Sequence, residues 1–226
     1  MSPAKKISKK TMKQDRFVST TLKTSEYIQQ NKKFFIGGGI AIIVAILSIY
    51  LVSYTNSQKI VNSENMFGSA QLSGAMGEPG AAAEQYKEIL NQYPNSAVAD
   101  RACYYLARTE FDQDKIDTAL IYYEQYIKDY GKEPILLTGA YAGAAVCYEK
   151  QDNYTKAADY YMKAAETANN DVYSPEYLMD AGRTYKEAGM LTEAQNAYQQ
   201  VVDKYNRSPY YSMARKKLAE VEYVQK

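Results

Sequence analysis

The chain has 226 residues, of which 24 are tyrosine and none is histidine or tryptophan. The lack of histidine excludes Ser-His and Cys-His catalytic pairs and His-containing zinc sites, and no other catalytic motif stands out, so we expect neither enzyme activity nor a cofactor. Nine Lys and Arg against two acidic residues give residues 1–33 a net charge of +7, which leaves about −6 for the rest of a chain whose total is +1. Nucleic-acid-binding domains are usually basic, so nucleic acid is not expected as a partner of this mildly acidic part. Because no catalytic motif stands out, a small-molecule substrate is not expected either.

Residues 1–33 are expected to form a basic cytoplasmic tail. Residues 1–14 are rich in lysine and predict disorder. Residues 15–33 predict a helix with Phe17, Leu22 and Ile28 roughly along one side. This helix could lie on the membrane surface or on a partner, or its lysines could simply be attracted to anionic lipid, and the sequence leaves these alternatives open.

Residues 34–54, FFIGGGIAIIVAILSIYLVSY, contain no charged residue. A helix of this length spans about 31 Å, which matches the roughly 30 Å hydrocarbon core of a bilayer. A buried core helix is one alternative, but Lys32 and Lys33 before the segment, with Tyr50 and Tyr54 near its end, are typical of membrane interfaces. A cleaved signal peptide would have a shorter apolar region. The segment therefore predicts a transmembrane signal anchor that is not cleaved.

The flanks of this segment predict its orientation. Because the basic flank precedes it, the N-terminus should remain in the cytoplasm and residues 55–226 should lie outside. The glycines at 37–39 do not match a phosphate-binding loop, since no strand precedes them and no Lys-Ser/Thr follows. Gly37, Ala41 and Ala45 form a small-xxx-small line, which weakly indicates a transmembrane partner.

The rest of the chain is repetitive. Four segments align without gaps, at 77–95, 114–132, 152–170 and 189–207, and each has alanine at its sixth position and tyrosine at its tenth. These residues are Ala82, Ala119, Ala157 and Ala194, and Tyr86, Tyr123, Tyr161 and Tyr198. Helical stretches precede the last three segments, and a weaker one at 63–76 precedes the first. The unit is therefore a helix, a short turn and a second helix.

This pattern resembles the tetratricopeptide repeat (TPR) family, whose unit is a pair of helices with a Leu-Gly pair, small residues and aromatics at fixed positions. Leu106–Ala107, Tyr148, and Gly182 with Tyr185 match its first helix, although the usual tryptophan is absent and the spacing is three or four residues longer. The resemblance implies an all-α fold, in which one transmembrane helix is followed by an α-solenoid of about four TPR-like helix hairpins. Residues 206–224 align with 94–112 and predict a C-terminal capping helix.

With the anchor, the chain is similar to the ancillary SecYEG translocon subunit family of bacterial inner-membrane proteins. That resemblance implies a single-pass protein of the bacterial inner membrane with its TPR domain in the periplasm. The implied partners are translocon subunits, periplasmic chaperones or client polypeptides, besides the lipid bilayer. The links between the repeats also resemble TPR proteins of outer-membrane assembly and cell division, so a structural cell-envelope scaffold is the alternative.

In the TPR family, the first helices of the repeats line a concave groove in which four positions of each helix meet ligands. Carried over residue by residue, the resemblance implies a partner-binding groove lined by Arg101, Tyr104, Arg108, Phe111, Val146, Glu149, Met179, Arg183 and Lys186. The remaining groove positions are Gly139, Ala142 and Glu176. The small residues among them, Gly139 and Ala142, would leave room for a peptide or a partner helix.

Two other features predict structure rather than chemistry. The stretch DQDKID at 112–117 resembles the start of a calcium loop but lacks its glycine and glutamate, which indicates a solvated turn. Cys103 and Cys147 fall at different positions of two first helices, about 9 Å apart along the helix axis, so two buried thiols are expected rather than a disulfide. Among the clustered tyrosines, Tyr123 and Tyr126 are expected in the core, Tyr130 in the link between repeats, and Tyr122 without a packing role.

Overall fold

The computed structural model describes residues 9–170 and 172–224. Within these residues every regular element is a helix, which confirms the predicted all-α class. The chain divides into two compact units between Gln58 and Lys59. Most of the predicted disordered tail, at residues 1–8, lies outside the described residues.

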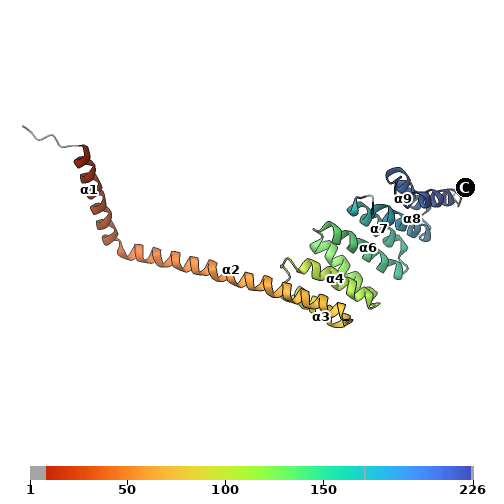
Figure 1. Cartoon of the computed structure of the whole chain (residues 1–226), viewed down its shortest axis with the longest axis horizontal. Helices are drawn as coiled ribbons and strands as arrows, with labels where there is room; N and C mark the ends of the chain where they lie inside the picture. Colours follow the sequence, from red (N-terminus) through yellow and green to blue (C-terminus); the bar gives the residue numbers. More distant parts are fainter. Residues whose placement is uncertain (1–8, 171, 225–226) are drawn as a thin grey trace, which may run out of the picture. The chain divides into compact units, whose positions relative to one another are not determined.

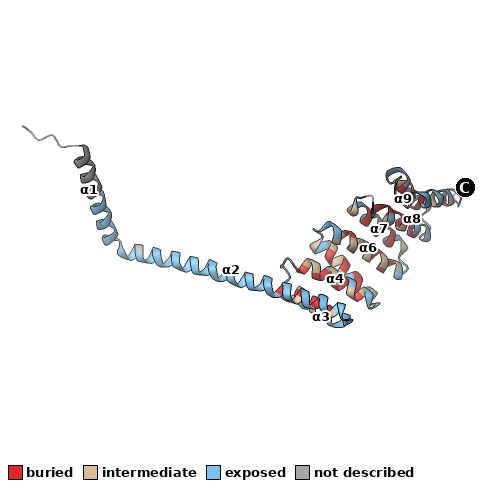
Figure 2. Ribbon diagram, viewed as in Figure 1, coloured by how far each residue is buried: buried red, intermediate tan, exposed pale blue. Residues whose placement is uncertain are grey.

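The first unit contains α1 (Lys9–Gln30) and the larger part of α2 (Lys32–Ala75), both labelled in Figure 1. α1 begins earlier than predicted, because residues 9–14 are Lys, Thr, Met and Gln, mostly good helix formers that continue the helix. Among the described residues, α2 is the one helix that is long and apolar enough to cross a membrane. Within its apolar segment, Phe34 and residues 36–54 are exposed. The ribbon of this part of α2 is pale blue in Figure 2, so the apolar segment is not a core helix of the solenoid.

The second unit is a stack of helix pairs, each packed on the next (Figure 1). The last part of α2 packs on α3 (Pro79–Gln92) and forms the first pair. The other pairs are α4 (Ala99–Asp112) with α5 (Ile116–Gln125), α6 (Pro134–Lys150) with α7 (Tyr154–Ala168), and α8 (Ser174–Glu187) with α9 (Leu191–Lys204). α10 (Tyr211–Val224) packs on α9 and closes the stack. The predicted solenoid of four hairpins and a capping helix is therefore confirmed.

The repeated alanines and tyrosines form the core, as predicted. All four alanines and all four tyrosines are buried. Buried residues, red in Figure 2, recur along the helices of the stack. The tyrosines pack on small residues of first helices: a Cβ atom at Gly143 would come within 3.0 Å of the Tyr123 ring, and one at Gly182 within 3.0 Å of the Tyr198 ring. Small residues on the first helices therefore allow the close approach of the bulky second-helix tyrosines.

The neighbouring tyrosines follow the prediction with one exception. Tyr126 is fully buried, and the Tyr130 hydroxyl donates to the Pro94 carbonyl at 3.5 Å, which ties two successive links together. The prediction for Tyr122 was wrong, because its ring is partly buried and packs against the core clusters of both the first and the second repeat.

Each hairpin turn contains one residue in the left-handed region of backbone space. These residues are Gly77, Asp114, Asp152 and Gly189, with φ of 82°, 59°, 58° and 75°. Glycine adopts this region at no steric cost, and aspartate tolerates it better than most residues. The acidic stretch that begins like a calcium loop is thus the turn between α4 and α5.

The link after the second repeat differs from the others. α5 ends in a π-helical turn, η1 (Tyr126–Tyr130), in which the Gly131 N–H donates to the Tyr126 carbonyl at 2.8 Å. A π turn takes one more residue than an α turn. η1 falls in the interval from Ala119 to Ala157, which is one residue longer than the intervals between the other repeated alanines.

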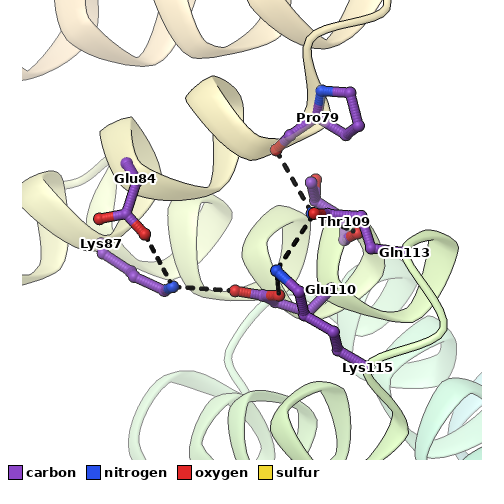
Figure 3. Close-up of polar contacts among 7 residues, drawn as sticks. All are labelled: Pro79, Glu84, Lys87, Thr109, Glu110, Gln113 and Lys115. Carbon is purple, nitrogen blue, oxygen red and sulfur yellow. Dashed lines mark hydrogen bonds and ion pairs between the residues drawn. The ribbon is translucent and has the colours of Figure 1, made fainter.

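A buried carboxylate joins the first two repeats (Figure 3). Glu110 of α4 is 1% exposed, and its oxygens lie 2.9 Å from the Lys87 ammonium of α3 and 3.1 Å from that of Lys115, which precedes α5. Burial alone would raise the pKa of Glu110, but the two ammonium groups outweigh it and the pKa is lowered. Beside this pair, the Gln113 amide donates to the Pro79 carbonyl at 3.4 Å. The network fixes α3 against α4 and the turn that follows.

Candidate protein-binding groove

The nine predicted groove residues all lie on the first helices of repeats two to four. α4 carries Arg101, Tyr104, Arg108 and Phe111; α6 carries Val146 and Glu149; and α8 carries Met179, Arg183 and Lys186. Their exposure differs widely. Arg108, Arg183 and Lys186 are exposed, whereas Met179 is buried and the others are intermediate. The repeat register therefore places all nine residues on first helices, as predicted, but only three of them are exposed.

Arg101 is bound within the fold. Its guanidinium donates to both oxygens of Glu64 on α2, at 2.8 and 2.9 Å, and lies 4.6 Å from the centre of the Phe67 ring. Both hydrogen bonds come from one guanidinium nitrogen, and this ion pair combined with a cation–π contact holds the side chain in one position. Arg101 therefore attaches α4 to the first repeat and presents little unpaired charge to a partner.

The aromatic groove residues of α4, Tyr104 and Phe111, pack against the core of the second repeat. The Tyr104 ring packs edge-on against Tyr123 at 6.1 Å and Tyr126 at 5.9 Å between ring centres. A Cβ atom at Gly139 would meet the Tyr104 hydroxyl, so the glycine makes space for this ring against α6. Phe111 packs against the same core cluster. These side chains are half-buried, so only part of each ring is open to a ligand.

An ion pair crosses from the third repeat to the fourth. Glu149 on α6 accepts hydrogen bonds from the Arg183 guanidinium at 2.7 Å and the Thr184 hydroxyl at 2.9 Å, both on α8. Burial would raise the pKa of Glu149, but these donors lower it. Arg183 also lies 3.7 Å from Asp180, so part of its charge is already paired.

A cavity of about 340 Å³ opens at the C-terminal end of the stack, and four predicted groove positions line it: Glu176, Met179, Arg183 and Lys186. Its lining comprises Glu176, Met179, Asp180, Arg183, Lys186, Glu187, Tyr198, Tyr210, Met213 and Lys217. Tyr210, Met213 and Lys217 come from α10 and the link before it, and the sequence reasoning missed them. Met213 aligns with Arg101 in the repeat register, so extending the groove positions into the capping helix would have found it.

A family model described as a tetratricopeptide repeat-like domain matches residues 25–223. The chain belongs to this family. The matched range takes in the apolar segment of α2 as well as every helix of the tetratricopeptide stack. No curated protein matches the chain significantly.

Solved tetratricopeptide structures resemble this chain in fold. A tetratricopeptide repeat protein from Parabacteroides merdae is 18% identical with a TM-score of 0.57, over 71% of this chain and 60% of that one. The MamA protein is 18% identical with a TM-score of 0.56, over 70% and 80% of the two chains. TPR-like repeats of a putative kinesin light chain from Podosopora anserina are 14% identical with a TM-score of 0.53, over 72% and 86%. The chain thus spans less than two thirds of the Parabacteroides protein.

The tetratricopeptide fold is typically a non-enzymatic scaffold for protein interactions. Among the described residues, no three His, Cys, Asp or Glu side chains converge in a way that could hold a metal ion. Cys103 and Cys147 are both buried thiols, as predicted, and burial raises the pKa of each to about 12. These thiols are packing residues of the tetratricopeptide core.

Proposed function

We propose that this protein is a membrane-anchored TPR scaffold that binds segments of partner or client proteins in its groove. The observation that carries the proposal is the groove surface itself. The exposed Arg108, Arg183 and Lys186 lie on first helices that also carry half-buried aromatic side chains, and Arg183 and Lys186 line the cavity at the fourth repeat. Cations beside apolar surface suit protein segments with carboxylates and apolar side chains.

The finer part of the proposal is an accessory or chaperone-type role at the Sec translocon. On this view α2 crosses the bacterial inner membrane once, with the N-terminus in the cytoplasm and the TPR domain in the periplasm. The basic charge of residues 1–33 before the apolar segment supports this orientation. The family match supports an association of anchor and repeats, because it includes both.

A second candidate is a structural scaffold of the cell envelope, recruited through its anchor and tail. The observation that favours it is that several predicted groove residues are engaged within the fold. Arg101 pairs with Glu64, Glu149 pairs with Arg183, and Met179 is buried. If those contacts are permanent, the groove would be structural and the partner would bind elsewhere.

In-membrane crosslinking followed by identification of the crosslinked proteins separates the two candidates. We expect the triple substitution Arg108→Ala, Phe111→Ala and Arg183→Ala to remove the main crosslinked partner, since these residues cover the groove from the second repeat to the fourth. Deletion of residues 2–31, which keeps Lys32 and Lys33 before the apolar segment, should leave this partner. A matched control replaces Lys128, Arg207 and Leu72, which lie outside the proposed groove, with alanine.

The pattern of losses decides the outcome. Retention of every partner by the groove variant would refute groove binding, and loss on deleting the tail alone would favour the envelope scaffold. Recovery of translocon subunits would support the translocon role. Recovery of cell-division or outer-membrane assembly proteins in their place would contradict it.

A further inference from the structure

The last turns of α2 have one buried side and one exposed side. Phe67 and Ala70 lie in the core of the first repeat. The exposed side, which we call the open face of α2, carries Val61, Asn65, Gly68, Leu72 and Ala75. Their spacing of four, three, four and three residues places them along one side of the helix. A Cβ atom at Gly68 would meet no described atom within 4 Å, so the described part of the chain leaves this side uncovered.

The open face differs in charge from the other end of the stack. Between residues 60 and 76 the one charged residue is Glu64, and it is paired with Arg101. At the C-terminal end, α10 exposes three charged residues, Arg215, Lys216 and Glu222. The terminal repeats of a solenoid need a polar outer side for solubility. On the open face Val61 is 52% exposed and Leu72 is 60% exposed without such charges, so we expect another surface to cover it.

The open face has the spacing of a heptad repeat, abcdefg. Asn65 and Leu72 occupy position a, and Val61, Gly68 and Ala75 occupy position d. α2 is one helix, and counting back in sevens gives its earlier a and d positions as Gly37, Ile40, Val44, Leu47, Leu51, Tyr54 and Gln58. No charged residue occupies an a or d position from 37 to 75. A heptad pattern of this length is typical of helices that pair side by side.

A second copy of this chain is the surface that fits the open face. If α2 crosses the membrane as proposed, every copy has the same orientation, so two α2 helices lie parallel and equivalent residues meet at the same depth. Asn65 then faces its equivalent in the other copy, and a polar Asn at position a fixes the register of parallel coiled coils. Gly68 allows the two helices to approach closely. A charged partner would find no opposite free charge on the open face.

We propose that the open face of α2 packs against the open face of a second copy, so that the protein forms a parallel homodimer along this helix. The inference rests on the membrane anchor of the proposed function but not on groove binding, because the groove residues lie on α4, α6 and α8. The contact is one helix face, and the bilayer supplies the effective concentration by confining both copies. In dilute detergent solution the copies separate.

Disulfide crosslinking of the full chain in its native membranes tests the pairing. Val61→Cys and Ile60→Cys are matched variants, because the two side chains are neighbours with similar exposure but only residue 61 lies on the open face. A disulfide needs Cα atoms within about 7 Å, which equivalent d positions of a parallel pair satisfy and residues facing away do not. With copper phenanthroline as oxidant, we expect Val61→Cys to give at least about tenfold more product at twice the chain mass of 25.5 kDa.

The crosslinked products decide the proposal. Equal yields from the two variants, or no dimer from Val61→Cys, would refute the pairing. A product of any other mass would show that a different protein covers the open face, which would refute the pairing too. The native thiols do not interfere, because Cys103 and Cys147 are buried.

A charge on the open face should separate the two copies. With Asn65→Cys as the crosslinking reporter, we expect Val61→Glu to lower the dimer yield at least about fivefold, because two glutamates would face each other across the pair. Ile60→Glu adds the same charge away from the open face and should leave the yield unchanged. Equal effects of the two glutamates would overturn the proposal.

The groove variant distinguishes this inference from the proposed function. If Val61→Cys gives the dimer while the groove triple substitution keeps every partner, groove binding fails and the homodimer stands. If the groove variant loses its partner but Val61→Cys gives no dimer, the homodimer fails and groove binding stands.

Discussion

At the scale of single residues, Glu110 shows how one buried charge ties three segments together. Its carboxylate is inaccessible to solvent, while the side chains of Lys87 and Lys115 remain 31% and 52% exposed. The lysines can therefore keep part of their hydration while they neutralise the acid, which reduces the cost of burying the pair. Replacing the acid would remove both ion pairs, and Lys87 would keep only its pair with Glu84.

We predict that Glu110→Gln lowers the free energy of unfolding by about 1–2 kcal/mol, because solvent screens the half-exposed Lys115. The pKa of Glu110 is lowered in the folded chain, so its contribution is complete above about pH 4.3 and is lost as pH falls through the folded pKa. Urea unfolding of the wild-type chain and of Glu110→Gln, at pH 7 and at pH 3, measures this difference in the free energy of unfolding. The matched control is Glu84→Gln, which removes an acid that pairs with the same Lys87 but is 76% exposed and should change stability by less than about 0.5 kcal/mol.

A second residue-scale prediction concerns the glycines under the repeat tyrosines. Gly143→Ala should lower the free energy of unfolding by about 1–3 kcal/mol, because the new methyl group would overlap the Tyr123 ring, which is 5% exposed and has no room to move. Gly68→Ala on α2 should raise it by about 0.5–1 kcal/mol, since nothing lies near its Cβ position and alanine favours helix. Thermal unfolding followed by circular dichroism compares the two, and shifts of the same sign would contradict the packing argument.

At the scale of elements, the single helix α2 contributes to two different parts of the chain. Its apolar segment predicts a membrane anchor, and its last turns supply the first helix of the first repeat. Phe67 on those turns is 4% exposed, and its ring lies 5.6 Å from that of Tyr86 on α3 and 5.7 Å from that of Tyr105 on α4. The weak helix expected at 63–76 therefore completes a full repeat, because α3 and α4 cover its apolar side.

We predict that Phe67→Ala destabilises the first repeat by about 3–5 kcal/mol, through the lost burial and the cavity left behind. Limited proteolysis should then cut preferentially between α3 and α4. Leu72→Ala, a change on the same helix at a residue that is 60% exposed, should leave the cleavage pattern and the urea midpoint unchanged. Equal sensitivity of the two variants would mean that the end of α2 does not belong to the repeat stack.

The repeat register accounts for most of what the sequence could predict. Alanine and tyrosine at fixed positions identify both helices of each hairpin, because only small residues permit the observed approach of bulky ones. The same register could not tell which groove residues are already paired. The Arg101–Glu64 pair depends on α2 continuing into the first repeat, and the Glu149–Arg183 pair joins side chains 34 positions apart.

At the scale of the whole molecule, the chain joins an apolar segment suited to lipid with a solenoid suited to protein surfaces. Arginine at the centre of a membrane helix costs about 2.5–3.5 kcal/mol. We therefore predict that Ile42→Arg with Ile46→Arg moves the protein from the membrane fraction to the soluble fraction, whereas Ile60→Arg, beyond the apolar segment, does not. Carbonate extraction and blotting measure the distribution. Membrane retention by the double variant would contradict the assignment of residues 34–54 as the anchor.

The buried thiols make the orientation of the anchor measurable. Because burial raises the pKa of both Cys103 and Cys147 to about 12, neither should react with maleimide in the folded chain. Ser25 and Ser57 are exposed on opposite sides of the apolar segment, so Ser25→Cys and Ser57→Cys report the two ends separately. With an impermeant maleimide on intact cells, we expect labelling of Ser57→Cys alone and labelling of Ser25→Cys only after lysis. The reverse result would refute a cytoplasmic N-terminus, and labelling of both in intact cells would show that the segment does not span the membrane.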